Sequence, residues 1–298
     1  MIIRVCSIPS PTGRENKKAA YIRELLENTA AASAKAGPLL TDEAGNVLYF
    51  YNPAGSRKVI LAAAHIDTVF EDLDAIRPVE KEDGKLYAPS VGDNSAGVAA
   101  LVFIAGMLAE LGCSPAQGIL FAFNVGEEGL GNLRGIKHIM REHADLINEV
   151  IAVDGGYESV VNEAVGSFRY SVGIRTQGGH SWKDFGSTNA ILYACRIIER
   201  IYRIDVPENP KTTYNVGLIK GGTSVNTIAE DAEFVADLRS VEKNSLKSLQ
   251  AEFINVLKQA SKEFSENGVK VRWELLGERP CGKTDDNAPL IKRIKKLR

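Results

Sequence analysis

Two short apolar runs that each end in histidine or acidic side chains constrain the fold of this chain most. Residues 59–64 lead directly into His65-Ile66-Asp67, and residues 119–125 lead into Gly126-Glu127-Glu128-Gly129. Short, continuously apolar runs are typical of strands buried on both faces of a parallel sheet. Between them, residues 98–111 are apolar over a helix-like length. The pattern therefore predicts alternating strands and helices in a layered α/β domain with a mostly parallel central sheet.

The side chains at these strand ends indicate a metal site. Residues two apart on a strand face the same way, so the His65 imidazole can bind an ion while the Asp67 carboxylate orients the ring. Neighbouring carboxylates point apart, so one of Glu127 and Glu128 can bind metal while the other acts on water. Taken singly, His-x-Asp is more often a structural pair and Glu-Glu-Gly a solvated turn.

Two further acids fall at similar junctions. Asp93 lies in the polar turn 91–97 ahead of the apolar helix, and Asp154 follows a short predicted strand at 149–153. Asp93 is either a helix N-cap or a carboxylate shared between two cations. Open α/β sheets bind their ligands at such strand ends. The four motifs together therefore predict one common site.

In this combination the motifs resemble those of the co-catalytic zinc hydrolases, a family that includes glutamate carboxypeptidase, acetylornithine deacetylase, succinyl-diaminopimelate desuccinylase and peptidase T. The similarity runs from Ile8-Pro9-Ser10-Pro11-Thr12-Gly13 to about Thr284, and the peptidase T-like members look nearest. It implies a catalytic domain at residues 1–164 and 277–298, and an inserted α+β lid and dimerisation domain at residues 165–276.

The resemblance also assigns roles to the strand-end residues. Asp67 would support His65, Glu127 would be the general base, and the Asp93-Asn94 peptide bond would be cis. Two zinc ions per subunit are expected: His65 and Asp154 would bind one, Glu128 the other, and Asp93 would bridge them. The implied metal ligands are His65, Asp93, Glu128 and Asp154.

The middle of the chain resembles the lid of this family in its Gly178-Gly179-His180-Ser181 motif. The resemblance implies that His180 reaches across a homodimer interface and hydrogen-bonds the developing oxyanion in the partner's active site. Without the resemblance, a histidine beside two glycines is more often a surface loop residue.

Two later residues, Asn226 and Arg239, match positions that the family uses to hold the carboxylate end of its substrate. Arginine suits this role because its planar fork pairs with a carboxylate at two points. The structural alternative for Arg239 is an outward strand residue that pairs with Asp237 or Glu233.

One departure from the family pattern concerns the second metal. The family carries a further metal-binding histidine toward its C-terminus, but the last of the four histidines in this chain is His180. We therefore expect that the C-terminal part of the catalytic domain is missing from this sequence. If residue 298 were the natural end, Asp93 and Glu128 alone would fall short of the four ligands usual for zinc. Weak binding of the second metal and impaired activity would follow.

The bulk composition favours a soluble cytoplasmic enzyme. With 36 basic and 38 acidic side chains the formal charge is −2, which gives no electrostatic case for nucleic acid or membrane binding. We expect no apolar run to reach the roughly 18 residues that span a bilayer, and we see no signal-peptide core in the first residues. The cysteines are widely separated, which favours a reduced compartment. They are Cys6, Cys113, Cys195 and Cys281.

These observations lead to one principal functional hypothesis and two alternatives. The first is hydrolysis of an amide bond in a small peptide by metal-activated water, as in an aminopeptidase or tripeptidase. The second is an N-acyl-amino-acid deacylase of the same family. The third is a catalytically silent, metal-poor relative that acts as a dimeric binding protein.

Overall fold

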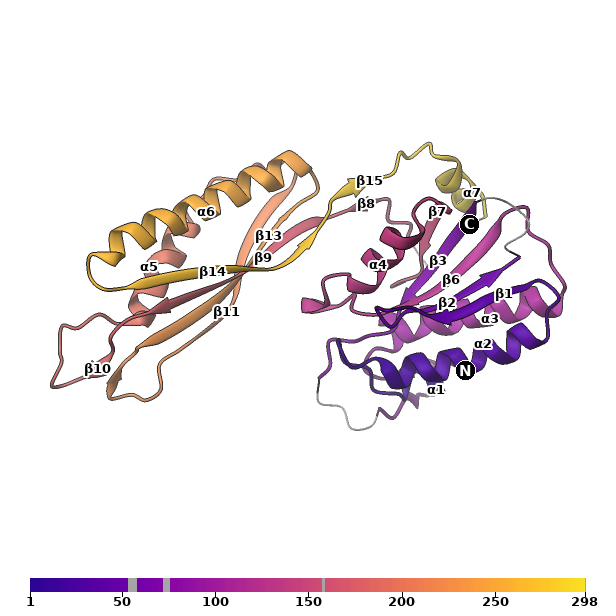
Figure 1. The fold of residues 1–298 in the computed structure, drawn as a ribbon, viewed down its shortest axis with the longest axis horizontal. Helices are drawn as coiled ribbons and strands as arrows, with labels where there is room; N and C mark the ends of the chain where they lie inside the picture. Colours follow the sequence, from indigo (N-terminus) through magenta and orange to yellow (C-terminus); the bar gives the residue numbers. More distant parts are fainter. Residues whose placement is uncertain (53–57, 72–75, 157–158, 298) are drawn as a thin grey trace. The chain divides into compact units, whose positions relative to one another are not determined.

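The computed structural model describes residues 1–52, 58–71, 76–156 and 159–297. The chain forms two compact units, Met1–Val160 (unit 1) and Val161–Arg298 (unit 2), which are described separately (Figure 1).

Unit 1 is built on a five-stranded sheet in the order β1-β2-β6-β3-β7. The β6–β3 and β3–β7 pairs are parallel, while β2 is antiparallel to both β1 and β6. Four of these five strands therefore run in one direction, which confirms the mostly parallel sheet. The strands are β1 (Ala36–Thr41), β2 (Val47–Tyr51), β3 (Val59–His65), β6 (Gly118–Asn124) and β7 (Ile147–Ala152).

Helices cover both faces of this sheet because alternate strand residues point to opposite sides. One core contains Ile22 and Leu101 packed with Phe121, and the opposite core contains Ile139 packed with Leu61. Figure 1 shows the corresponding layers, with α2 and α3 on one side of the sheet and α4 on the other. The helices are α1 (Ile2–Cys6), α2 (Asn16–Ala31), α3 (Ala96–Glu110) and α4 (Arg134–His143).

The predicted central elements are present, while smaller ones were not anticipated. Strand β1 has the sequence AGPLLT, whose glycine and proline obscure a strand pattern. Among the described helices, the segment Val91–Glu110 is long and apolar enough to cross a membrane by length and composition alone, contrary to our expectation for this chain. Its residues Val98, Leu101 and Val102 are buried in the core of unit 1. The remaining elements of unit 1 are β4 (Val79–Glu80), β5 (Leu86–Tyr87) and the short helical turns Val91–Ser95 and Gly129–Gly131.

Unit 2 is an antiparallel sheet in the order β11-β13-β9-β14, packed against two helices. Its strands bury alternate residues, such as Val172 on β9 and Phe234 on β13, against helix residues such as Phe253. Helix α5 begins at Ala190, because the side chain of Asn189 caps the backbone N–H groups of Ile191 and Leu192. The elements are β9 (Gly166–Arg175), α5 (Ala190–Ile201), β11 (Thr212–Gly221), β13 (Asp231–Ser240), α6 (Lys243–Ser265) and β14 (Lys270–Arg279).

The chain enters and leaves the sheet of unit 2 through a two-stranded ribbon. Strand β8 (Glu163–Ala164) pairs with β15 (Gly282–Lys283), so the two ends of the inserted segment lie together. Strand β14 ends at Arg279, and the domain boundary expected at residue 276 stays a prediction. Beyond the ribbon lies helix α7 (Pro289–Leu297), and its assignment to the catalytic domain stays a prediction. A second ribbon joins β10 (Gly179–His180) to β12 (Thr227–Ile228).

Candidate functional site

His65 is the last residue of β3 and is 4% exposed, at the sheet edge where parallel strands end. Its Nδ1 lies 3.1 Å from the backbone oxygen of Asp67. A ring N–H at Nδ1 can donate to that carbonyl, so the lone pair of a neutral ring lies on Nε2. Nε2 faces Asp93 Oδ1 at 2.8 Å and Asp154 Oδ1 at 3.8 Å. The strand thus presents one nitrogen toward two carboxylates.

Asp67 connects the ends of β3 and β6. It is 1% exposed, and its two carboxylate oxygens accept the backbone N–H groups of Glu127 at 3.0 Å and Glu128 at 2.9 Å. The hydroxyl of Thr12 donates to the same carboxylate at 2.9 Å. Burial alone would raise the pKa of Asp67, but the bonds from His65 and these donors lower it below its usual value. Asp67 is therefore a buried anion that orients both His65 and the glutamate pair.

Asp93 lies in the turn before α3, and the Asp93-Asn94 peptide bond is cis, as the resemblance implied. The Asn94 side chain donates to the backbone oxygen of Val153 at 2.7 Å. This bond ties the turn to the segment that carries Asp154. Gly97 allows the close approach, since a Cβ there would lie 2.2 Å from Asn94 Oδ1. The turn therefore places Asp93 beside the end of β7.

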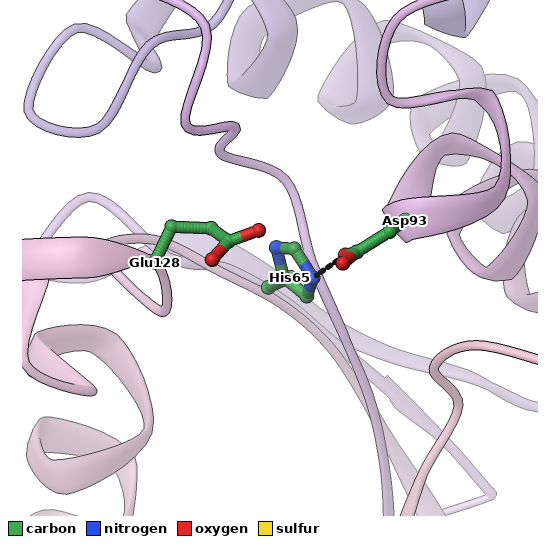
Figure 2. A group of neighbouring side chains, drawn as sticks. All are labelled: His65, Asp93 and Glu128. Carbon is green, nitrogen blue, oxygen red and sulfur yellow. Dashed lines mark hydrogen bonds and ion pairs between the residues drawn. The ribbon is translucent and has the colours of Figure 1, made fainter.

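Ligand atoms of His65, Asp93 and Glu128 all lie within 4.8 Å of one another. Figure 2 shows the imidazole of His65 between the two carboxylates. The group arises from three different segments: the end of β3, the turn before α3 and the loop after β6. One imidazole and two carboxylates form a donor set that suits zinc and other divalent transition metals.

The electrostatics of this group favour a bound cation. Burial lowers the pKa of His65, but the carboxylates of Asp154 and Asp67 outweigh it and raise the value to about 11. Burial, Asp93 and Glu127 together raise the pKa of Glu128, because they disfavour a further negative charge. Asp154 has a lowered pKa, chiefly through His65. A metal ion would satisfy these carboxylates, and the residues present fit one.

A second metal would find fewer protein ligands in the described part of unit 1. Asp93 and Glu128 could serve it, which is two of the four ligands that zinc usually takes. Two other histidines of unit 1 are engaged elsewhere: His138 Nε2 lies 3.8 Å from Asp42 Oδ2, and the ring of His143 packs edge-on against Phe50.

Sequence reasoning did not assign two residues that support the site, Thr12 and Glu15. Glu15 is 3% exposed, and its Oε1 accepts the N–H groups of Gly13 at 2.9 Å and Gly126 at 3.1 Å. Arg134 lies 3.6 Å from the same oxygen. Glu15 lies just after the motif at residues 8–13, and its contact with Gly126 spans more than one hundred residues of sequence, so no local pattern indicates it.

In unit 2, His180 and Asn226 lie on the same ribbon. His180 pairs with Thr227 in register, and the N–H of Ser181 donates to the backbone oxygen of Asn226 at 3.0 Å. Arg239 is on β13, where its Nε donates to the carboxylate of Asp237. That contact is the structural alternative considered above, and the substrate-binding role of Arg239 stays a prediction.

Two family profiles match the chain. The peptidase dimerisation domain of the M20 peptidases matches residues 162–265, within unit 2. Peptidase family M28 matches residues 46–195, which include β3, α3 and β6.

Relatives and solved structures extend these matches. Acetylornithine deacetylase of Myxococcus xanthus is 30% identical over 238 residues, which are 74% of this chain and 60% of that protein. Carboxypeptidase G2 of Pseudomonas sp. is 26% identical over 71% of this chain and 50% of its own length. The chain thus spans about half to three-fifths of these two relatives. A tripeptidase structure from Staphylococcus aureus has a TM-score of 0.75 at 24% identity, covering 99% of this chain and 79% of that one. The tripeptidase structure shows a shared fold, and the dimerisation-domain profile together with the two relatives shows that the chain belongs to the M20 peptidase family.

Proposed function

We propose that the protein hydrolyses an amide bond in a small peptide, as an aminopeptidase or tripeptidase, with zinc in the site of unit 1. The observation that carries the proposal is the cluster of His65, Asp93 and Glu128 with a further carboxylate, Glu127, beside it on the same loop. Zinc bound there would supply Lewis-acid chemistry and lower the pKa of water. The tripeptidase with a similar fold supports the choice of a peptide substrate.

The roles of the protein side chains follow from their chemistry. His65, Asp93, Glu128 and Asp154 would hold the bound metal, His65 and Asp154 at one zinc position and Glu128 at the other. Glu127 is not needed as a ligand and removes a proton from the attacking water, then delivers it to the leaving amine. Asp67 acts indirectly, through Glu127 and His65. Its carboxylate accepts the N–H of Glu127 and faces the ring of His65.

The second unit supplies the remaining roles in this proposal. His180 from a partner subunit stabilises the oxyanion of the tetrahedral intermediate, and Asn226 with Arg239 holds the carboxylate end of the peptide. The match of unit 2 to a peptidase dimerisation domain supports a homodimer. The pairing of β10 with β12, which joins the His180 and Asn226 segments, supports their action in one place.

N-acyl-amino-acid deacylation is the second candidate. It is favoured by the relative with 30% identity, an acetylornithine deacetylase. Both reactions break an amide bond and need the same metal and base, so the difference lies in the group that occupies the acyl side of the bond.

The proposal is tested by measuring bound metal per chain, after purification without chelators, beside hydrolysis of a tripeptide and of several N-acetyl amino acids. Glu127→Gln should keep its metal and lose about 10²- to 10⁴-fold in kcat, the usual contribution of a general base. His65→Ala and Asp154→Ala should lose metal first. Glu110→Gln, at the exposed end of α3, is the matched control.

The outcomes separate the candidates. Turnover of the tripeptide alone supports the peptidase, and turnover of the N-acetyl amino acids alone supports the deacylase. Little or no bound metal together with neither activity would support the catalytically silent, metal-poor relative. A Glu127→Gln variant with unchanged turnover would remove Glu127 from the role of base.

The action of His180 across the dimer has its own test. Mixing His180→Ala subunits with Glu127→Gln subunits should restore part of the turnover, because one heterodimer site then holds both intact residues. No recovery in verified heterodimers would contradict the role in trans.

A further inference from the structure

The backbone around His180 is held by hydrogen bonds on both sides. Strand β10 pairs with β12, so His180 lies opposite Thr227, and the N–H of Ser181 donates to Asn226. After His180 the chain turns back on itself, and the N–H of Asp184 donates to the backbone oxygen of His180 at 2.9 Å. His180 itself is exposed, at the start of a turn that these backbone hydrogen bonds hold.

The ring of His180 accepts hydrogen bonds from this turn. The backbone N–H of Trp182 donates to Nδ1 at 3.2 Å, and the N–H of Lys183 approaches the same atom at 3.5 Å. A nitrogen that accepts an N–H bond carries a lone pair rather than a proton. In the neutral ring the proton is then on Nε2, the nitrogen that these two N–H groups do not contact, and Nε2 can donate.

Asp184 closes the turn that supplies these donors. Its Oδ2 accepts the N–H of His180 at 2.7 Å, in addition to the backbone bond between the same two residues. The carboxylate also lies against Gly179, where a Cβ would be 2.9 Å from Asp184 Cβ and 3.0 Å from Oδ2. Two bonds between His180 and Asp184 therefore set the position of Trp182 N–H relative to the ring.

We infer that Asp184 is a positioning residue that delivers His180 as a neutral hydrogen-bond donor with its proton on Nε2. An oxyanion requires a donor at the position where charge develops, and a donor held in place before reaction avoids reorganisation. The catalytic consequence rests on the proposed function of His180, whereas the position of the proton on the ring does not.

The state of the ring is measured directly by ¹⁵N–¹H long-range correlation spectra of the histidine side chains in the full chain at neutral pH. The signals of His180 are identified by their loss in His180→Ala. The wild-type protein should show the proton on Nε2. Asp184→Ala should give a mixture of the two tautomers, while Asp184→Asn, which keeps an acceptor oxygen, should retain the wild-type pattern. Glu208→Ala removes an exposed acid of a distant lid loop and should change nothing.

Kinetics of the metal-loaded protein then separate positioning from a general structural role. Loss of an oxyanion donor in His180→Ala should lower kcat about 10²- to 10³-fold. Asp184→Ala should lower kcat about 10- to 100-fold with little change in KM, as expected of a displaced catalytic group. In the His180→Ala background the same Asp184→Ala change should have no further effect, because Asp184 acts through His180.

Two results would overturn the inference: a wild-type ring with its proton on Nδ1, or effects of His180→Ala and Asp184→Ala on kcat that multiply. If His180→Ala leaves kcat unchanged, the proposed oxyanion role fails instead, and the tautomer spectra still decide whether Asp184 sets the ring.

Discussion

Replacing Asp67 with asparagine tests whether its carboxylate holds the ends of β3 and β6 together. The wild-type carboxylate accepts the N–H groups of Glu127 and Glu128 on different oxygens. An asparagine has one oxygen, so its NH₂ group must face either the N–H of Glu127 or both the N–H of Glu128 and the hydroxyl of Thr12, which share one oxygen. A buried donor left without an acceptor costs about 1–3 kcal/mol, and the lost charge-assisted bond adds to this.

The size of this effect can be measured locally by hydrogen exchange. Under conditions in which exchange reports the opening equilibrium, a loss of about 1–3 kcal/mol corresponds to roughly 5- to 150-fold faster exchange. We expect it in the peptide that contains Glu127 and Glu128 after β6. Asp145→Asn, an exposed acid of unit 1, should leave this peptide unchanged. Metal affinity should also fall about 10- to 100-fold, the usual effect of losing a group that orients a ligand.

Equal exchange in Asp67→Asn and wild type would refute the argument, because it would mean that the carboxylate does not hold the two N–H groups. Faster exchange with unchanged metal affinity would confirm the structural link and contradict the orienting role toward His65.

Three further predictions concern the interior of unit 1. Lys18 is buried and its pKa is lowered to about 8, chiefly by that burial; Lys18→Met should therefore stabilise the protein at pH 7 by about 1–3 kcal/mol in denaturant unfolding. The wild-type folded state binds fewer protons than the unfolded state between pH 8 and 10.5, so this gain should shrink as pH rises through that window, and a constant gain would contradict the assignment. The pKa of His65 is raised to about 11 without metal, so zinc binding at pH 7 should release about one proton. Calorimetry in buffers of different ionisation enthalpy measures this release, and His65→Ala should abolish it. A Cβ at Gly135 would lie 2.4 Å from the Val125 backbone oxygen, so Gly135→Ala should lower the free energy of unfolding by about 1–3 kcal/mol. Gly106→Ala, in a helix with open space at the Cβ position, should be neutral or stabilising, and equal effects of the two alanines would contradict the packing argument.

The central elements of both units could be predicted because the spacing of apolar residues along the sequence indicates which side chains are buried. Strands β3 and β6 are apolar up to their last residues, His65 and Asn124, and are buried almost throughout, and β9 and β13 alternate as one-sided strands do. Strand β1 and the two-residue strands lack such a signal, since their pairing depends on partners elsewhere in the chain. The start of α5 at residue 190 depended on a side-chain cap rather than on hydrophobic pattern.

Sequence alone determined the chemistry that this protein can offer: which residues end the central strands, and that a histidine and several carboxylates occupy those ends. Strand ends of one parallel sheet lie at one edge, so their meeting was also foreseeable. Tertiary structure decided which atoms meet. It brought Asp93 Oδ1 to 2.8 Å from His65 Nε2 and joined Asp67 to the N–H groups of two glutamates. It also placed the carboxylate of Glu15 where it accepts the N–H of Gly126. Such contacts join segments up to 111 residues apart, and their geometry follows from side-chain packing and hydrogen bonding that no local pattern records.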